Sequence, residues 1–392
     1  MSYNFDQIVN RTGTNSIKYD FAIERGMPVD VLPLWVADMD FPTAPAITEA
    51  LTKAAEHGIF GYSESKNDYF NAVYHWYKNR FQWETKGEWL IKTPGVVFAI
   101  AAAVRALTKE GDAVLIQPPV YYPFSHVIVK NNRKLVNNPL IYENGAYRID
   151  FDDFEDKLMK HQVKLFILCS PHNPVGRVWT KEELTKLGDL CMKYKVTVIA
   201  DEIHSDFTYP GYTHTVFGSI KEEFLMNAVI CTAPSKTFNL AGLQVSNVFV
   251  ADKEKRRKIR DEIDRSGYSQ LNTMGLIACQ TAYEKGADWL ENLKGYLKGN
   301  LDFMRSFLGE NIPQVKLVEP EGTYLVWLDF NALNLSEEEL ENLIINKAKL
   351  WLDRGTMFGE EGSGFQRVNI ACPRATLEKA MKQLAEAVKS NI

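Results

Sequence analysis

The feature that most constrains the fold is a regular alternation of apolar and amphipathic segments in the middle of the chain. Short apolar runs, rich in β-branched residues and without polar alternation, predict strands buried on both faces. These runs span 113–117, 164–169, 196–200, 228–232 and 245–251. Helical patterns separate them, for example at 182–194 and 253–264. The alternation predicts an α/β fold with a mostly parallel sheet and helices on both sides.

The two ends of the chain have different patterns. Residues 1–45 are polar and then apolar with interrupting prolines, which predicts an irregular arm. The last hundred residues predict two strands, at 324–330 and 366–371, among helices. A chain of 392 residues has room for a large domain and a smaller one. We expect an arm over 1–45 that contributes to the small domain, a large ligand-binding domain over 46–288, and a small α+β domain over 289–392.

Composition excludes several classes of function. The net charge is −5 and the only basic block is the short run Lys253 to Arg260, so nucleic acid is not expected as a partner. The five cysteines are far apart and form no CxxC pair, which argues against a disulfide framework or a zinc site. His172, His204 and His214 lack the spacing of metal ligands. Residues 1–10 have no apolar signal-peptide core and no stretch approaches about 20 apolar residues, so we expect a cytoplasmic protein with no membrane partner.

Polar and aromatic residues follow the predicted strands. Tyr121 and Tyr122 follow the first, Asn173 the second, Asp201 the third and Lys236 the fourth. In open α/β sheets ligands bind outside the carboxyl ends of the strands, so we expect these side chains to converge on one crevice. A lysine, an aspartate, an asparagine and an aromatic pair form a set that suits pyridoxal 5′-phosphate (PLP).

Each member of this set meets a chemical demand of PLP. A lysine amine forms a Schiff base with the cofactor, and a carboxylate keeps the pyridine nitrogen protonated so that the ring accepts electrons. An aromatic ring can stack on the pyridine. Thr93 to Val97 precede a predicted helix whose first backbone amides can bind the phosphate, and Gly95 allows close approach.

Each residue taken alone also has a purely structural interpretation. An aspartate at a strand end, such as Asp201, commonly caps a turn, and a lysine between serine and threonine, such as Lys236, is typical of a solvated loop. Gly95 can serve only as a turn before a helix, and Tyr121 can pack under a loop. Asn173 before a proline is a common turn. Periodicity and spacing alone indicate an α/β enzyme with an unidentified ligand.

Longer strings carry a resemblance to a known family. Ser-Pro-His-Asn-Pro-Val-Gly-Arg, Asp-Glu-Ile-His-Ser-Asp, Ser-Lys-Thr-Phe-Asn-Leu-Ala-Gly and Arg-Val-Asn-Ile-Ala-Cys-Pro occur in this order at 170–177, 201–206, 235–242 and 367–373. Together they resemble the fold-type I, aspartate aminotransferase-like PLP enzymes. This resemblance implies a large domain with a mostly parallel seven-stranded sheet and a smaller α+β C-terminal domain. Trp-Val-Ala-Asp-Met-Asp-Phe, Phe-Gly-Tyr and Gln-Pro-Pro-Val-Tyr at 35–41, 60–62 and 117–121 resemble the cystathionine β-lyases, or cysteine-S-conjugate β-lyases, of the MalY/PatB type.

The resemblance implies roles for the matching residues around the PLP ring. Lys236 is implied as the Schiff-base lysine and general base, and Asp201 as the partner of the ring nitrogen. Asn173 is implied to bond the ring 3-oxygen, and Tyr121 to stack on the ring and to contact substrate. Aminotransferases usually carry a tyrosine where this chain has His204. The resemblance leaves His204 as a cofactor contact, and this difference from the aminotransferase pattern fits the lyase subgroup.

The resemblance also implies how the phosphate and the substrate are bound. The backbone amides of Gly95, Val96 and Val97, with the Ser235 hydroxyl, are implied to hold the phosphate. Tyr62 is implied to reach the phosphate of a neighbouring subunit, which implies a homodimer with shared sites. Arg367, with Asn173, is implied to bind the substrate carboxylate, a role that suits the planar guanidinium. Aminotransferases often carry a phosphate-binding arginine eight residues after the lysine, and this chain has Gln244 there.

The resulting prediction is a PLP-dependent carbon–sulfur β-lyase. It is expected to cleave cystathionine, cysteine or related S-conjugates to pyruvate, ammonia and a thiol or sulfide. A PLP-dependent aminotransferase is the alternative, because both reactions begin with loss of the α-proton. A PLP-binding regulatory protein with secondary lyase activity is an alternative of another class.

Overall fold

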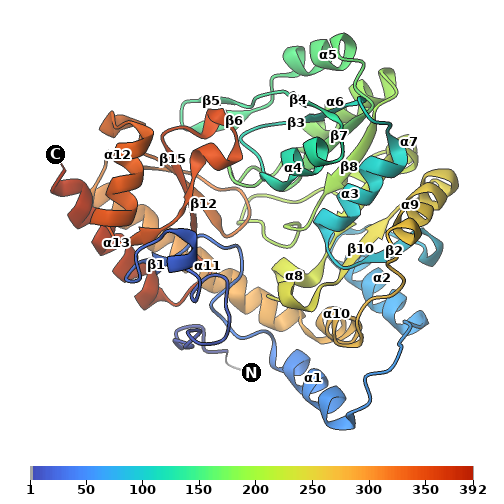
Figure 1. The fold of residues 1–392 in the computed structure, drawn as a ribbon, viewed down its shortest axis with the longest axis horizontal. Helices are drawn as coiled ribbons and strands as arrows, with labels where there is room; N and C mark the ends of the chain where they lie inside the picture. The colour runs from blue at the N-terminus through green and yellow to red at the C-terminus, as the bar shows by residue number, and fades with distance from the viewer. Residues whose placement is uncertain (1–2, 392) are drawn as a thin grey trace.

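The computed structural model describes residues 3–391 and contains a central sheet of seven strands (Figure 1). The order across the sheet is β2-β10-β9-β8-β7-β3-β4. Neighbouring strands from β9 to β4 are parallel, and β10 is antiparallel to both β9 and β2. The strands are β2 (Leu90–Thr93), β3 (Ala113–Ile116), β4 (Lys134–Asn137), β7 (Leu165–Cys169), β8 (Thr197–Asp201), β9 (Ala228–Thr232) and β10 (Ser246–Phe249). The predicted seven-stranded, mostly parallel sheet is confirmed.

Side chains of the central strands are buried on both faces of the sheet. In β7 every residue is buried; Leu165 and Ile167 join one hydrophobic cluster, and Phe166 and Leu168 join the other. The first cluster contains apolar residues of α3 (Val96–Leu107), α4 (Pro123–Lys130) and α9 (Lys253–Arg265), whereas the second contains residues of α2 (Asn67–Phe81), α6 (Lys181–Lys193) and α10 (Thr273–Lys285). Two covered faces explain why the sequence shows continuous apolar runs instead of alternation.

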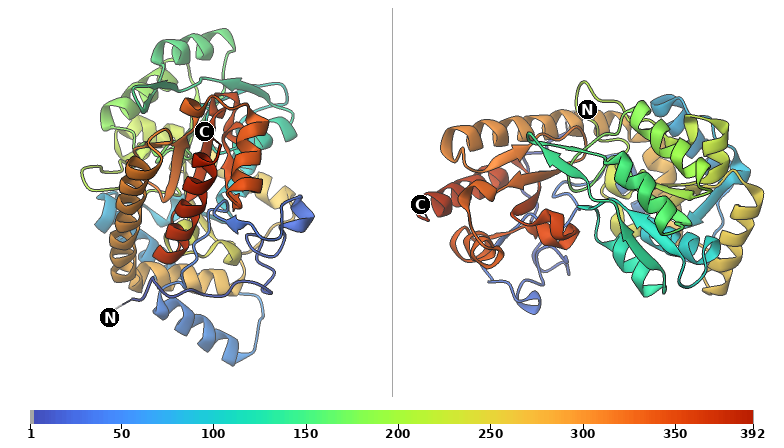
Figure 2. Two further views of the ribbon diagram at one scale, coloured as in Figure 1. Left: turned by 90° about the vertical axis from the view of Figure 1, so that its left-hand side faces the viewer. Right: turned by 90° about the horizontal axis from the view of Figure 1, so that it is seen from above.

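Most helices of this part of the chain lie around the sheet, whereas the blue helix over residues 45–57 lies at the edge of the molecule (Figures 1 and 2). Their bounds are α1 (Pro45–His57), α2 (Asn67–Phe81), α3 (Val96–Leu107), α4 (Pro123–Lys130), α5 (Phe151–Lys160), α6 (Lys181–Lys193), α7 (Glu222–Asn227), α8 (Pro234–Thr237), α9 (Lys253–Arg265) and α10 (Thr273–Lys285). A short hairpin, β5 (Ile141–Glu143) with β6 (Ala146–Arg148), lies outside the main sheet. None of the helices within residues 3–391 combines the length and the apolar character needed to cross a membrane.

The C-terminal part builds a separate antiparallel sheet in the order β11-β12-β15-β14. Its elements are α11 (Ala287–Asn311), β11 (Lys316–Val318), β12 (Leu325–Asp329), α12 (Glu337–Asn342), β13 (Leu350–Trp351), β14 (Asp353–Arg354), β15 (Phe365–Asn369) and α13 (Arg374–Lys389). In the N-terminal arm, β1 (Leu32–Pro33) pairs in parallel with β13, so the arm lies against this part. The boundaries 1–45, 46–288 and 289–392 stay predictions.

Candidate active site

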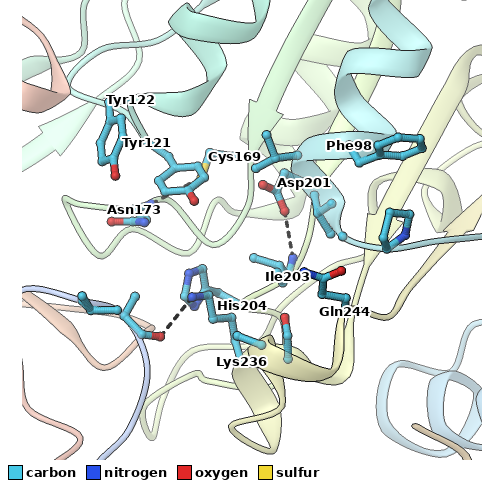
Figure 3. Close-up of a pocket in the computed structure, with 18 of the residues that line it drawn as sticks. Phe98, Tyr121, Tyr122, Cys169, Asn173, Asp201, Ile203, His204, Lys236 and Gln244 are labelled. Carbon is cyan, nitrogen blue, oxygen red and sulfur yellow. Dashed lines mark hydrogen bonds between the residues drawn. The ribbon is translucent and has the colours of Figure 1, made fainter. Parts of the chain in front are cut away.

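A cavity of about 490 Å³ lies at the carboxyl ends of β7, β8 and β9, beside the start of α3 (Figure 3). Residues of the N-terminal arm and the C-terminal sheet complete its wall. The cavity brings together all the predicted site residues except Tyr62. The predicted residues in its lining are Gly95, Val96, Val97, Tyr121, Asn173, Asp201, His204, Ser235, Lys236 and Arg367. Tyr62 is fully exposed, away from this cavity.

Asp201 is the last residue of β8, and its carboxylate faces the cavity. The side chain is 4% exposed, and Oδ1 accepts a hydrogen bond of 3.2 Å from the backbone N–H of Ile203. Burial raises the pKa of this carboxyl group to about 7, although the Ile203 N–H and the positive charge of Lys236 oppose the rise. A buried carboxylate without an ion-pair partner is stabilised in its charged form when a cationic group binds beside it.

Lys236 lies in the short helix α8, directly after β9. Its Nζ donates a hydrogen bond of 3.0 Å to the carbonyl oxygen of Ala37 in the N-terminal arm (Figure 3). Desolvation and the nearby positive charge of Arg367 lower the pKa of the amine to about 8, against the opposing pull of Asp38 and Asp201. Roughly a tenth of this amine is therefore unprotonated at pH 7, far more than for an ordinary lysine, and this is the form that acts as nucleophile and base.

The start of α3 provides an open cradle on the opposite side of the cavity. Gly95 is the N-cap residue, and its backbone is extended (φ 173°), a conformation that any residue adopts. A Cβ built on Gly95 would meet no atom within 4 Å, so the absence of a side chain leaves space in front of the first amides of α3. Free N–H groups at a helix N-terminus bind anions such as phosphate.

Aromatic and imidazole side chains form another part of the cavity wall. Tyr121 is held through its backbone N–H, which donates a hydrogen bond of 3.0 Å to the carbonyl oxygen of Asn173. The neighbouring Tyr122 also lines the cavity. His204 is 3% exposed, its Nδ1 has no hydrogen-bond partner, and burial lowers its pKa well below the ordinary value. His204 therefore presents a neutral imidazole.

Arg367, in β15, forms the cationic end of the cavity. Nη1 donates to Oδ1 of Asn173 at 3.0 Å and Nη2 donates to the carbonyl oxygen of Trp35 at 2.9 Å. Nη2 also forms an ion pair with Asp353, and the guanidinium carbon lies 4.9 Å from the centroid of the Phe358 ring. Only 3% of Arg367 is exposed and its Nε has no partner, so the group is held in place with a donor still available.

Two groups that contribute to the site were not predicted from the sequence. The carbonyl oxygen of Ala37 accepts from Lys236 and also from the Tyr324 hydroxyl at 2.9 Å, and a backbone acceptor leaves no local sequence signal. Asp353 pairs with Arg367 because β14 and β15 align these two residues directly across from each other. The contact of Asp353 with Arg367 could have been predicted only from knowledge that β14 pairs with β15.

Among the residues that the structure describes, a second arginine of the C-terminal part, the histidines and the cysteines add no further catalytic or metal-binding group to the site. Arg374 does not line the cavity; its Nε donates to Oδ1 of Asn300 at 2.9 Å. Within residues 3–391 no group of histidine, cysteine and acidic side chains has the arrangement of a metal site. The five cysteines are buried and unpaired.

Comparison with known proteins identifies the family. The model of the family aminotransferase class I and II matches residues 29–384. Cystathionine beta-lyase PatB of Bacillus subtilis is 46% identical over 98% of this chain and 100% of its own length. Protein MalY of Escherichia coli is 33% identical over 99% of both chains.

Solved structures agree with this result. Cystalysin from Treponema denticola, which contains a pyridoxal 5′-phosphate cofactor, superimposes with a TM-score of 0.96 at 38% identity and covers 100% of both chains. A PLP-bound C-S lyase from Staphylococcus hominis gives a TM-score of 0.92 at 31% identity, over 99% of this chain and 98% of the other. The fold is thus the aspartate aminotransferase-like fold, and the chain belongs to the aminotransferase class I and II family, among relatives of the MalY/PatB type.

Proposed function

We propose that this protein is a PLP-dependent carbon–sulfur β-lyase that cleaves cystathionine, cysteine or related S-conjugates to pyruvate, ammonia and a thiol or sulfide. The observation that carries the proposal is the meeting of Lys236, Asp201 and Arg367 in one cavity. The relatives that match the whole chain include proteins named cystathionine beta-lyase and C-S lyase. These names favour a lyase over the aminotransferase alternative.

The residues present fit PLP. Asp201 forms no salt bridge with any residue in the described part of the chain, and burial raises its pKa, so a pyridinium N–H supplies the cation that this carboxylate lacks. The space in front of Gly95 and the first amides of α3 suits the phosphate, with the Ser235 hydroxyl beside it. Tyr121 and Asn173 line the same cavity, where they can offer a stacking face to the ring and a donor to its 3-oxygen.

When bound, PLP supplies an electron-accepting ring that stabilises negative charge on the substrate α-carbon. The chain supplies the groups that bind the substrate and move its protons. Arg367 binds the substrate carboxylate, and its contacts with Asn173 and Trp35 hold the guanidinium in one orientation. Lys236, with its pKa lowered to about 8, removes the α-proton near neutral pH. The Ala37 carbonyl gives the Lys236 amine a fixed acceptor.

The assembly and the compartment are part of the same proposal. Tyr62 is fully exposed beside Ile59 and Phe60, which are 71% and 65% exposed, and an exposed apolar segment of this kind suits an interface with a second copy of the chain. A homodimer in which Tyr62 reaches the partner's phosphate site is therefore proposed. Five unpaired cysteines suit a reducing compartment, which supports the cytoplasm.

The test is an assay of the purified protein with PLP, cystathionine and no added keto acid. We expect steady pyruvate release from the wild type and none from Lys236→Ala, together with loss of the visible absorbance band of PLP bound to lysine. Lys193→Ala, which removes an exposed amine on α6, serves as the control. Amino transfer that requires a keto acid would indicate the aminotransferase instead. Pyruvate release by Lys236→Ala at the wild-type rate would contradict the assignment.

A further inference from the structure

The carboxylate-binding end of the cavity contains an acidic group as well as a basic one. Asp353 is 3% exposed and lines the same cavity as Arg367. Its carboxylate forms an ion pair with Nη2 of Arg367, on the directly opposite residue of the neighbouring strand. No other side chain in the described part of the chain donates a hydrogen bond to it. Asp353 therefore adds a fixed negative charge beside the group that binds the substrate carboxylate.

The charges around the cavity are few. Among the described residues of its lining, the cationic side chains are Lys236 and Arg367, and the anionic ones are Asp201 and Asp353. Lys236 and Asp201 are engaged with the cofactor under the proposed function. Arg367 is thus the one cation left for a substrate, and Asp353 already offsets its charge. One carboxylate can use the remaining donors of Arg367, but a second carboxylate finds no cation of its own.

We propose that Asp353 is a specificity-determining residue that restricts the cavity to amino acids with an uncharged or net-neutral β-substituent and excludes dicarboxylic amino acids. This inference rests on the proposed function, since it takes Arg367 as the binder of the α-carboxylate. The thiol of cysteine is uncharged, and the distal amino-acid group of cystathionine carries one positive and one negative charge. A side-chain carboxylate, in contrast, brings a further negative charge into the cavity that Asp353 lines, and like charges held close together in a desolvated site oppose binding.

Aspartate and asparagine provide a matched pair of probes, because they have nearly the same size and differ by one charge. Their dissociation constants are measured by calorimetry on the PLP-loaded protein without a keto acid. For the wild type we expect asparagine to bind about tenfold or more tightly than aspartate, the size of effect that a juxtaposed like charge produces. Equal affinities in the wild type would overturn the proposal without any variant.

Asp353→Asn tests the residue itself. The amide keeps an oxygen that accepts from Arg367 but removes the charge, so the preference for asparagine should fall to about twofold while the dissociation constant of asparagine changes only a few-fold. Glu262→Gln is the control, because it removes a carboxylate paired with Arg105 at 2.6 Å, away from the cavity, and should preserve the preference. An unchanged preference in Asp353→Asn would overturn the proposal.

The same samples are assayed for pyruvate release from cystathionine. Normal release together with equal binding of the two probes refutes the role of Asp353 and leaves the lyase proposal standing. Absence of both pyruvate release and probe binding refutes the lyase proposal, and with it the inference that rests on it.

Discussion

The buried carboxylate of Asp201 predicts a variant that is more stable than the wild type when PLP is absent. Burial raises the pKa of Asp201 from 3.8 to about 7 in the folded protein. Between these values the folded state binds a proton that the unfolded state has released, so stability falls as the pH rises from about 4 to about 7 and stays low above it. Asp201→Asn has no charge at this position, so the folding stability of the variant should not fall over this pH range.

The magnitude follows from the two pKa values. Each pH unit between them corresponds to about 1.4 kcal/mol, which gives about 4 kcal/mol above pH 7 and about 1 kcal/mol at pH 4.5. A chain of 392 residues has an unfolding entropy of roughly 0.8 kcal/mol per kelvin. The variant should therefore melt about 5 °C above the wild type at pH 9, and about 1 °C above it at pH 4.5.

The assay is the melting temperature of the PLP-free proteins at both pH values. Asp264→Asn, a change of an exposed aspartate on α9, is the matched control and should shift the melting temperature little. With saturating PLP the advantage of Asp201→Asn should shrink, because the wild-type carboxylate then has a cationic partner. An unchanged melting temperature at pH 9, or an equal shift at both pH values, would falsify the reasoning.

Two further substitutions test the ends of the cavity. Gly95→Val places a side chain in front of the first amides of α3 and should weaken PLP binding about tenfold or more, as measured by fluorescence titration. The control Gly295→Ala, an exposed change on α11, should leave the affinity for PLP unchanged. Equal affinities of Gly95→Val and the wild type would mean that the first amides of α3 do not hold the phosphate. Arg367→Lys keeps the positive charge but loses the planar set of donors. It should raise KM for cystathionine by roughly 10- to 100-fold with a smaller fall in kcat. An unchanged KM would show that the substrate carboxylate binds elsewhere.

Much of the fold was predictable because buried parallel strands have a strong local signal. β7 is apolar throughout and β9 is apolar up to its last residue, Thr232, and the sequence places both within a residue of their observed bounds. β2 and β4 escaped prediction. They form the two edges of the sheet, and lysines such as Lys92 and Lys134 interrupt their apolar character, as is common in edge strands. The antiparallel direction of β10 was also invisible, because an apolar run looks the same in both directions.

Some residues of the candidate site could be predicted from local sequence, whereas others depend on long-range contacts. Lys236, Asp201 and Asn173 could be named from the sequence because each lies at the carboxyl end of a strand or within a few residues of it, and the carboxyl ends of neighbouring parallel strands meet at one edge. Gly95 could be named because it precedes a helix. These are properties of the chain within a few residues of each position, and the longer strings around them carry the family resemblance.

Only the tertiary structure decided what surrounds those residues. The Ala37 carbonyl meets Lys236 across 199 positions of sequence, and Asp353 meets Arg367 through the pairing of β14 with β15. Burial lowers the pKa of Lys236 and raises that of Asp201, and the cavity around them is lined by segments from distant parts of the sequence. Burial and long-range contacts depend on the whole packed chain, and no short stretch of sequence contains them.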